Sequence, residues 1–289
     1  MTATILDGEA LAADLKAELK VRVDALVAAG HVPGLGTILV GDDGPSANYV
    51  AMKHRDCEAL GIAGESVHLP AESTQSDVTA VIERFNQDPS IDAYLMQYPF
   101  PKQLDFEAAM LVVDPAKDVD GLHPVNLGRL VQGVEAPVAC TPAGIQALLV
   151  RYRVPIAGAH VVVVGRGLTI GRPLANLLSL KREHANAAVT VVHTGVPADR
   201  FRELCRSADV LVAAAGSPGL ITADMVKPGA AVVAAGVTFE GKRIVSDVAD
   251  DVAAVAGYLS PRIGGVGPMT RAMLLANCVA AAERRVAGG

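Results

Sequence analysis

The feature that most constrains the fold is a run of valines followed by closely spaced glycines, within residues 159–173. The four valines at 161–164 are β-branched and apolar on both faces, as expected for a buried strand of a parallel sheet. Gly165 and Gly167 allow a sharp turn, and Gly171 and Pro173 stand where a helix is expected to begin. The free amides at such a helix start attract an anion, typically a phosphate. The glycine spacing is one residue longer than the usual dinucleotide fingerprint, so an ordinary strand–turn–helix corner is the alternative.

The rest of the chain alternates short apolar runs with amphipathic segments. Leucine and valine recur every three or four residues from 11 to 26, which predicts a helix capped by Asp7. A later helix is expected to start with Thr141 as its cap and Pro142 at its first position. Further strands are expected at 37–40, 67–69, 93–96, 189–192, 210–214 and 231–234. Further helices are expected at 46–60, 76–85, 106–112 and 269–286, the last after a loop at 264–268.

This order predicts an α/β protein with two domains, in keeping with the length of 289 residues. We expect a first domain over 1–140, completed by the C-terminal helix 269–289 returning to it. The second domain, 141–268, is expected to be a Rossmann-type, doubly wound parallel sheet. In such sheets ligands bind at the carboxyl ends of the strands.

Composition excludes several classes of protein. The net charge of −6 argues against a nucleic-acid partner, and no run of about 18 apolar residues predicts a membrane span. The first residues lack the features of a signal peptide. Four scattered cysteines suit reduced thiols in the cytoplasm, and no His, Asp or Glu set has the spacing of a metal site.

Two polar pairs stand near the expected strand ends of the first domain. Tyr49 and Lys53 are four residues apart on a helix and share a face, so they can bind a flat heterocycle and move protons. Gln97 ends a strand and can hydrogen-bond Lys53 or a ligand. Asp118 and Asp120 precede Gly121; either can accept hydrogen bonds from the edge of an amino-pyrimidine ring, or serve only to form a turn. The alternative for Tyr49 and Lys53 is a solvated lysine beside a half-buried tyrosine, and the alternative for Gln97 is a loop-capping glutamine.

The residues after the strand at 189–192 bear on cofactor choice. His193, Thr194 and Gly195 stand where NAD-binding sheets usually place an acidic residue on the ribose. The missing acid, with Arg166 in the glycine turn, favours NADP over NAD. His193 and Thr194 are candidate donors to the 2′-phosphate.

Six motifs occur in a fixed order along the chain. They are Tyr49-Val50-Ala51-Met52-Lys53, Gln97-Tyr98-Pro99-Phe100-Pro101, Pro115-Ala116-Lys117-Asp118-Val119-Asp120-Gly121, Cys140-Thr141-Pro142-Ala143-Gly144, the turn 165–171, and Gly264-Gly265-Val266-Gly267-Pro268-Met269-Thr270. Together they resemble the bifunctional methylenetetrahydrofolate dehydrogenase/methenyltetrahydrofolate cyclohydrolase family. They span nearly the whole chain, which makes the resemblance far more specific than any single motif.

The resemblance implies a cytoplasmic homodimer of one-carbon metabolism that binds tetrahydrofolate derivatives and NADP, with the folate between its two domains. It implies oxidation of 5,10-methylenetetrahydrofolate, then hydrolysis of the methenyl product to 10-formyltetrahydrofolate. Lys53 would be the central catalytic residue, Tyr49 would stack on the folate, Gln97 would tune Lys53 and Asp120 would hold the pterin. Gly265 and Pro268 would shape the loop near both ligands. The cofactor residues would be Gly165, Arg166, Gly167, Gly171, His193 and Thr194.

The chain departs from the pattern of that family at several positions. Tyr98 and Phe100 stand where the family often has Leu, which predicts a bulkier folate side. Gly167 replaces a frequent Ser, Ala234 a usual Asp, and Arg262-Ile263 a segment that ends in Pro. These three departures bear on the nucleotide domain. Two other functions fit the residues: a shikimate-dehydrogenase-like oxidoreductase, and a catalytically impaired paralogue that binds folate or nucleotide.

Overall fold

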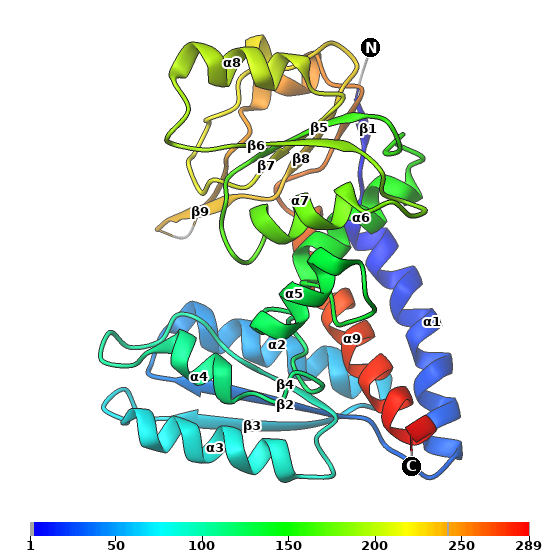
Figure 1. Ribbon diagram of the computed structural model, residues 1–289, viewed down its shortest axis with the longest axis vertical. Coiled ribbons are helices and arrows are strands. Elements are labelled where there is room, and N and C mark those ends of the chain that lie inside the picture. Colours follow the sequence, from blue (N-terminus) through cyan, green and yellow to red (C-terminus); the bar gives the residue numbers. More distant parts are fainter. Residues whose placement is uncertain (1–2, 242, 289) are drawn as a thin grey trace. The chain divides into compact units, whose positions relative to one another are not determined.

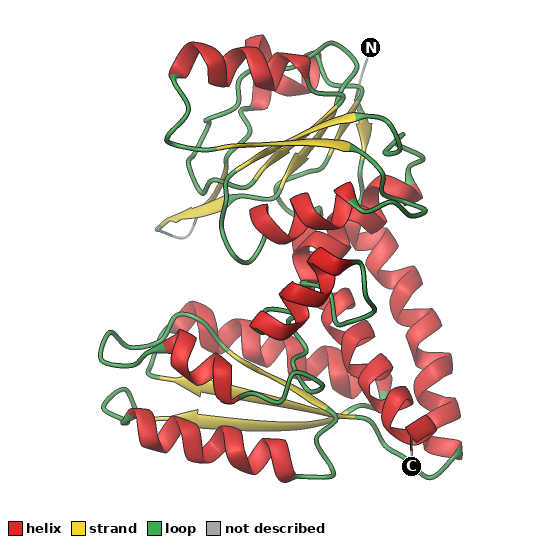
Figure 2. Ribbon diagram, viewed as in Figure 1, coloured by secondary structure: helices red, strands yellow, loops and turns green. Residues whose placement is uncertain are grey.

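The computed structural model describes residues 3–241 and 243–288 and divides into two compact units (Figures 1 and 2). The six-stranded unit comprises Met1–Ala13, Leu130–Val134 and Ala139–Met273. The three-stranded unit comprises Asp14–Arg129, Glu135–Val138 and Leu274–Gly289. Within the described ranges, the chain has no helix that is long and apolar enough to cross a membrane.

The three-stranded unit is built on a parallel sheet in the order β3-β2-β4. The strands are β2 (Gly34–Val40), β3 (Ala63–Leu69) and β4 (Ala93–Met96). The helices are α1 (Gly8–Ala28), α2 (Gly44–Leu60), α3 (Gln75–Gln87), α4 (Phe106–Val112), α5 (Pro124–Gln132) and α9 (Val266–Gly288), of which α1, α5 and α9 are shared with the other unit.

Alternation along β2 separates the two faces of this sheet. Ile38 and Val40 belong to a buried cluster that also contains Ile82 of α3 and Met110 of α4. Because successive side chains point to opposite faces, the intervening Thr37 faces the other side, where its hydroxyl contacts His54 of α2. Helix α2 therefore packs on the face of the sheet opposite to α3 and α4, although Ser66 and His68 of β3 remain exposed.

The C-terminal half of α9 packs in the three-stranded unit, as the sequence predicted. Glu283 pairs with Arg22 of α1 at 2.6 Å, and the Cys278 thiol lies 3.7 Å from the Gly34 carbonyl oxygen. These contacts join the last helix to the first helix and to the central strand.

The six-stranded unit is a parallel sheet in the order β1-β11-β8-β7-β5-β6, a doubly wound arrangement. Figure 1 shows α8 over one face of this sheet and α6 and α7 over the other. The strands are β1 (Thr4–Ile5), β5 (His160–Val164), β6 (Ala188–Val192), β7 (Val210–Ala213), β8 (Ala231–Ala234) and β11 (Tyr258–Leu259). The helices are α6 (Cys140–Arg151), α7 (Gly171–Ser179) and α8 (Ala198–Ser207), with short 3₁₀ turns η1 (Ala223–Met225) and η2 (Asp250–Ala254).

Several local expectations were wrong. Thr141 does not cap α6: the helix begins at Cys140, and the Thr141 hydroxyl lies 3.0 Å from that of Thr270 instead. The helix start expected at Gly171 and Pro173 is confirmed, by contrast: α7 begins at Gly171, and Pro173 is its third residue, where the missing N–H needs no intrahelical partner. The last helix begins at Val266, so it absorbs most of the loop expected at 264–268. The sequence also failed to predict α5 and the antiparallel hairpin of β9 (Val237–Glu240) and β10 (Arg243–Ser246).

Candidate functional site

In the three-stranded unit, the helix α2 brings Tyr49 and Lys53 to the region beyond the end of β2. Its first turn is capped by Asp43, whose carboxylate accepts a hydrogen bond from the Ser46 amide at 2.9 Å. Lys53 lies one turn after Tyr49, and its Nζ donates a hydrogen bond to Oε1 of Gln97 at 3.0 Å. The structure thus joins two residues that the sequence separates by 44 positions.

Gln97 is held in place at the end of β4. Its backbone N–H donates to the Ile38 carbonyl at 2.8 Å, which continues the ladder between β4 and β2. Its side-chain Nε2 donates to the Tyr98 carbonyl at 2.9 Å, so Oε1 is the atom left to face Lys53. Tyr49 remains 43% exposed, which leaves its ring accessible to a ligand.

The two aspartates of the 118–120 loop have different roles. Asp118 is buried, and its carboxylate accepts hydrogen bonds from the amides of Gly121 and His123 and from the side chain of Asn126. Asp118 therefore shapes the loop, as the turn-forming alternative predicted. Asp120 is only partly buried and close enough to Lys53 for the charge of the ammonium to act on it.

Burial raises the pKa of Asp120 above its ordinary value. The positive charge of Lys53 acts in the opposite direction and lowers it, while the neighbouring Asp118 raises it further. Lys53 therefore favours the ionised form of Asp120, the form that accepts hydrogen bonds. Lys53 thus lies close to Gln97 and Asp120, with Tyr49 one turn before it on α2; these four residues are called here the Lys53 site.

The sequence did not predict the residue that fixes the backbone beside Asp120. Asn277 of α9 donates from Nδ2 to the carbonyl oxygens of Val119, at 2.9 Å, and Val138, at 3.0 Å. The Val119 N–H donates in turn to the carbonyl of Tyr94 in β4. Asn277 lies 158 positions from Val119, and no local pattern links the two.

In the six-stranded unit, the glycine turn lies at the switch point of the sheet. β5 has β6 on one side and β7 on the other, and the crevice at such a reversal of strand order is where dinucleotides bind. Gly165 has φ +114°, and a Cβ built on it would lie 2.2 Å from the Ala214 carbonyl oxygen at the end of β7. A Cβ on Gly171 would lie 2.2 Å from the Gly165 carbonyl, so α7 starts directly against the turn. Only glycine permits this close approach at both positions.

Two predicted phosphate ligands meet beside this turn. Nη1 of Arg166, which follows β5, lies 3.4 Å from Nε2 of His193, which follows β6. Nδ1 of His193 accepts a hydrogen bond from the Gly195 amide, so the ring proton of the neutral imidazole is on Nε2. The Arg166 guanidinium and the N–H at Nε2 of His193 are therefore two hydrogen-bond donors that lie side by side, where one acceptor group can bind both. A 2′-phosphate supplies one, so these residues fit NADP.

The other predicted residues of this unit are placed as follows. Gly167 and Thr194 are exposed, and a Cβ on Gly167 would meet no heavy atom of the described residues within 4 Å. Gly265 packs against Gly8, whose Cβ would lie 1.8 Å from the Gly265 carbonyl oxygen. Pro268 lies in the first turn of α9. The structure therefore brings Arg166 and His193 together, but it places Gly265 and Pro268 in a different unit from the Lys53 site.

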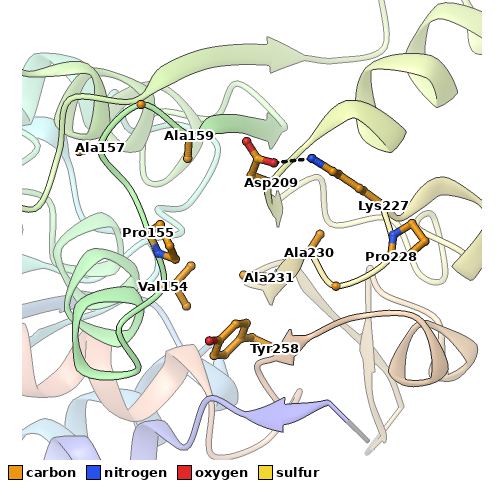
Figure 3. Close-up of a pocket in the computed structure, with 12 residues that line it drawn as sticks. Val154, Pro155, Ala157, Ala159, Asp209, Lys227, Pro228, Ala230, Ala231 and Tyr258 are labelled. Carbon is orange, nitrogen blue, oxygen red and sulfur yellow. Dashed lines mark hydrogen bonds and ion pairs between the residues drawn. The ribbon is translucent and has the colours of Figure 1, made fainter. Parts of the chain in front are cut away.

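A cavity of about 390 Å³ lies at the opposite, amino-terminal edge of the six-stranded sheet (Figure 3). Asp209, Ala231 and Tyr258, at the starts of β7, β8 and β11, line it together with Lys227. Lys227 Nζ and Asp209 Oδ1 form an ion pair at 2.6 Å, so these charges already satisfy each other. This cavity is separate from the switch point. Among the described residues no group of three or more His, Cys, Asp or Glu side chains could hold a metal ion.

Two family descriptions match the chain. Residues 6–120 match "Tetrahydrofolate dehydrogenase/cyclohydrolase, catalytic domain", and residues 139–286 match "Tetrahydrofolate dehydrogenase/cyclohydrolase, NAD(P)-binding domain". A curated relative, the bifunctional protein FolD of Syntrophotalea carbinolica, is 52% identical over 285 residues, covering 99% of this chain and 98% of its own length.

Solved structures agree with the sequence matches. The FolD methylenetetrahydrofolate dehydrogenase/cyclohydrolase of Campylobacter jejuni is 38% identical with a TM-score of 0.94, covering 98% of this chain and 99% of its own. The enzyme of Trypanosoma brucei, solved with NADP cofactor and inhibitor, is 37% identical with a TM-score of 0.93, covering 99% of both chains.

Proposed function

Because the chain belongs to the tetrahydrofolate dehydrogenase/cyclohydrolase family, we propose that it carries out both reactions of that family. It oxidises 5,10-methylenetetrahydrofolate to the 5,10-methenyl form with NADP, and it then hydrolyses that product to 10-formyltetrahydrofolate. The observation that carries the proposal is the hydrogen bond from Lys53 Nζ to Gln97 Oε1, made beside Tyr49 and Asp120. This set favours a folate enzyme over a shikimate-dehydrogenase-like enzyme, because the exposed aromatic ring and the carboxylate suit a flat amino-pyrimidine.

Folate binding is assigned to Tyr49 and Asp120. The Asp120 carboxylate accepts two hydrogen bonds from the amino-pyrimidine edge, and the exposed Tyr49 ring stacks on the substrate. Gly265 and Pro268 are proposed to shape the backbone that borders the ligands. These roles follow from the resemblance and from the chemistry of the side chains.

Cofactor binding is assigned to the switch point of the six-stranded sheet. The amides of the turn from Gly165 to Gly171 hold the pyrophosphate, while Arg166 and His193 bind the 2′-phosphate. Thr194 is an additional donor, and the exposed Gly167 leaves backbone amides accessible. When bound, NADP accepts the hydride that leaves the methylene carbon.

Lys53 is assigned to the hydrolytic step. Water attacks the methenyl carbon and loses both of its protons. One proton is released, and the other bonds to the ring nitrogen that takes the electron pair when its bond to that carbon breaks. A positioned acid–base group typically accelerates such a step by about 10²–10⁴. Gln97 aims Lys53 Nζ by accepting one of its three hydrogens. The oxidation forms a delocalised cation and removes no proton, so it depends mainly on the orientation of the two bound rings.

The test is Lys53→Gln, with oxidation and hydrolysis measured separately on one preparation. We expect hydrolysis of methenyltetrahydrofolate to fall by about 10²–10⁴ while a measurable part of the NADP-dependent oxidation survives. Wild-type protein is assayed in parallel with shikimate, which we expect it not to oxidise. Equal loss of both activities with intact folate binding would show that Lys53 only positions the folate.

We also propose that the enzyme is a cytoplasmic homodimer. The four cysteines are all free and buried, which suits a reducing compartment. The homodimer rests on the family resemblance, and sedimentation of the purified enzyme tests it.

A further inference from the structure

A partly buried network of side-chain hydrogen bonds lies on the α2 side of the three-stranded sheet and includes His54, the residue after Lys53. Thr37 of β2 is fully buried, and its Oγ1 lies 2.8 Å from Nε2 of His54 on α2. The same Oγ1 donates to Oγ of Ser66 on β3 at 3.1 Å. Because the Thr37 hydrogen is used by Ser66, Nε2 of His54 is the donor to Thr37. The three side chains form one directed chain of hydrogen bonds from α2 into the sheet.

The shape of β3 is adapted to the His54 ring. Gly64 pairs with Leu35 in the ladder between β3 and β2, two residues before Ser66 on the same face. A Cβ built on Gly64 would lie 2.4 Å from Nδ1 of His54 and 3.1 Å from Cε1. All three of the nearest heavy atoms belong to this ring. Glycine at position 64 therefore makes the space in which the imidazole lies.

His54 directly follows Lys53, so a displacement of its ring is transmitted to the backbone of the neighbouring residue. Successive side chains on a helix point about 100° apart, which lets His54 face the sheet while Lys53 faces Gln97. The apolar contacts of α2, such as those of Val50 and Leu60, are not directional. The hydrogen bond of His54 to the fixed Thr37 hydroxyl does set a direction, and it thereby fixes the rotation of α2 about its own axis.

The electrostatics favour a neutral imidazole in this position. Burial lowers the pKa of His54, and the charge of the adjacent Lys53 lowers it further. A neutral ring donates one hydrogen bond through Nε2 without placing a second positive charge beside Lys53.

We propose that His54 is a positioning residue for Lys53, acting through its hydrogen bond to Thr37 in the space left by Gly64. The inference rests on the proposed function, since the position of Lys53 is read through hydrolysis of methenyltetrahydrofolate. His54 touches neither substrate nor cofactor in this role. It sets where Lys53 Nζ stands relative to Gln97 Oε1.

The central experiment is Gly64→Ala, which displaces the ring without removing a polar group. We expect kcat for hydrolysis to fall about tenfold or more, because misplacement of about 1 Å can lower a rate by about 100-fold. KM for the folate and the affinity for NADP should stay within about threefold of wild type. The matched control is Gly44→Ala on the same helix, since a Cβ there meets no heavy atom of the described residues within 4 Å. We expect its kcat to stay within about twofold of wild type.

Variants of His54 provide the second arm. His54→Ala should lower kcat as Gly64→Ala does, and His54→Gln, which keeps a donor near Nε2, should recover most of the loss. In the His54→Ala background, Gly64→Ala should have no further effect, because the ring that its methyl group would strike is gone. Melting temperatures of all variants are measured alongside.

The outcomes separate the inference from the proposed function. Wild-type protein without either activity would refute the proposed function, and the positioning role with it. With an active wild type, an unchanged kcat in Gly64→Ala refutes the positioning role alone. Additive losses in the double variant, or failure of His54→Gln to exceed His54→Ala, would also refute it, because a general loss of stability predicts both.

Discussion

Substitution of Gly165 by alanine tests whether the close contact between β5 and β7 forms the cofactor site. Gly165 has φ +114°. A residue with a Cβ held in such a backbone conformation is strained by about 1–3 kcal/mol. The new Cβ would also lie 2.2 Å from the Ala214 carbonyl oxygen, closer than the 3.0 Å below which one group must shift. The turn and the end of β7 must therefore separate by about 0.8 Å, the difference between these distances.

The end of β7 cannot yield easily, because Asp247 holds the residues that follow it. This buried carboxylate accepts hydrogen bonds from the amides of Ala215 at 2.7 Å, Gly216 at 2.9 Å and Ser217 at 2.6 Å. The displacement consequently falls mainly on the 165–171 turn. If 1–3 kcal/mol of strain is relieved by moving the turn away from its binding geometry, the Kd for NADP should rise about 5–150-fold.

The chain contains no tryptophan, so the fluorescence of added NADPH can be titrated directly against little protein background. Hydrolysis of methenyltetrahydrofolate without NADP serves as the internal control, because its proposed residues lie in the three-stranded unit. Gly128→Ala on α5 is the matched variant, since its Cβ meets no heavy atom of the described residues within 4 Å. Unchanged NADPH affinity in a folded Gly165→Ala protein would refute the argument, and so would an equal loss of hydrolysis.

The remaining predictions concern the charged residues of the two sites. Asp120→Asn should weaken folate binding by about 1.5–3 kcal/mol, the range for hydrogen bonds to a charged group, and should leave NADP binding unchanged. Calorimetry measures both affinities, and an unchanged folate affinity would mean that Asp120 serves only to form the turn. Because the pKa of Asp120 is raised, the affinity for folate should begin to fall at a pH above the ordinary pKa of aspartate as the pH is lowered. In Lys53→Gln this fall should move to higher pH, since the charge that lowers the pKa of Asp120 is removed. A fall that persists in Asp120→Asn would contradict the assignment. Wild-type enzyme should have a higher kcat/KM with NADP than with NAD, and Arg166→Leu should reduce the ratio by lowering the NADP value alone; a wild-type preference for NAD would refute the cofactor assignment.

The sequence predicted the bounds of an element well where the local hydrophobic pattern agrees with how the element packs in the folded structure. The bounds expected for β4, α4 and β8 match the structure, because each is a compact apolar segment between breaks in the pattern. β2 and β3 are longer than expected, since Gly34, Gly36 and Gly64 read as poor strand residues. Packing explains these glycines: a Cβ on Gly34 would strike the Ser90 carbonyl, and one on Gly36 the Phe85 ring. The partners are distant in sequence, so no local pattern reveals them.

The candidate sites show the same division. Candidate residues such as Lys53 and Arg166 could be proposed from the sequence because they stand beside recognisable turns and strand ends. The residues that support the backbone near these sites could not be predicted. Asn277 bonds the Val119 carbonyl, and Asp247 bonds backbone amides of the loop after β7. Hydrogen bonds to the backbone require no particular residue type in the partner, so they produce no recognisable motif. The local sequence offered the same alternatives for Asp118 and Asp120, and only the family resemblance singled out Asp120. The structure adds that three donors already occupy the Asp118 carboxylate.

The two sites follow one topological rule but offer different chemistry. Both lie at the carboxyl ends of parallel strands, where the loops are free of the ladder and helices begin. In the six-stranded unit that edge presents backbone amides, a guanidinium and an imidazole, which suit a phosphate. In the three-stranded unit it presents an ammonium, a carboxamide and a carboxylate, which suit a heterocycle and proton transfer. Because each set is anchored within its own unit, substitutions at Gly165 and at Gly64 should impair different steps, and the ratio of the two activities identifies which edge a given residue supports.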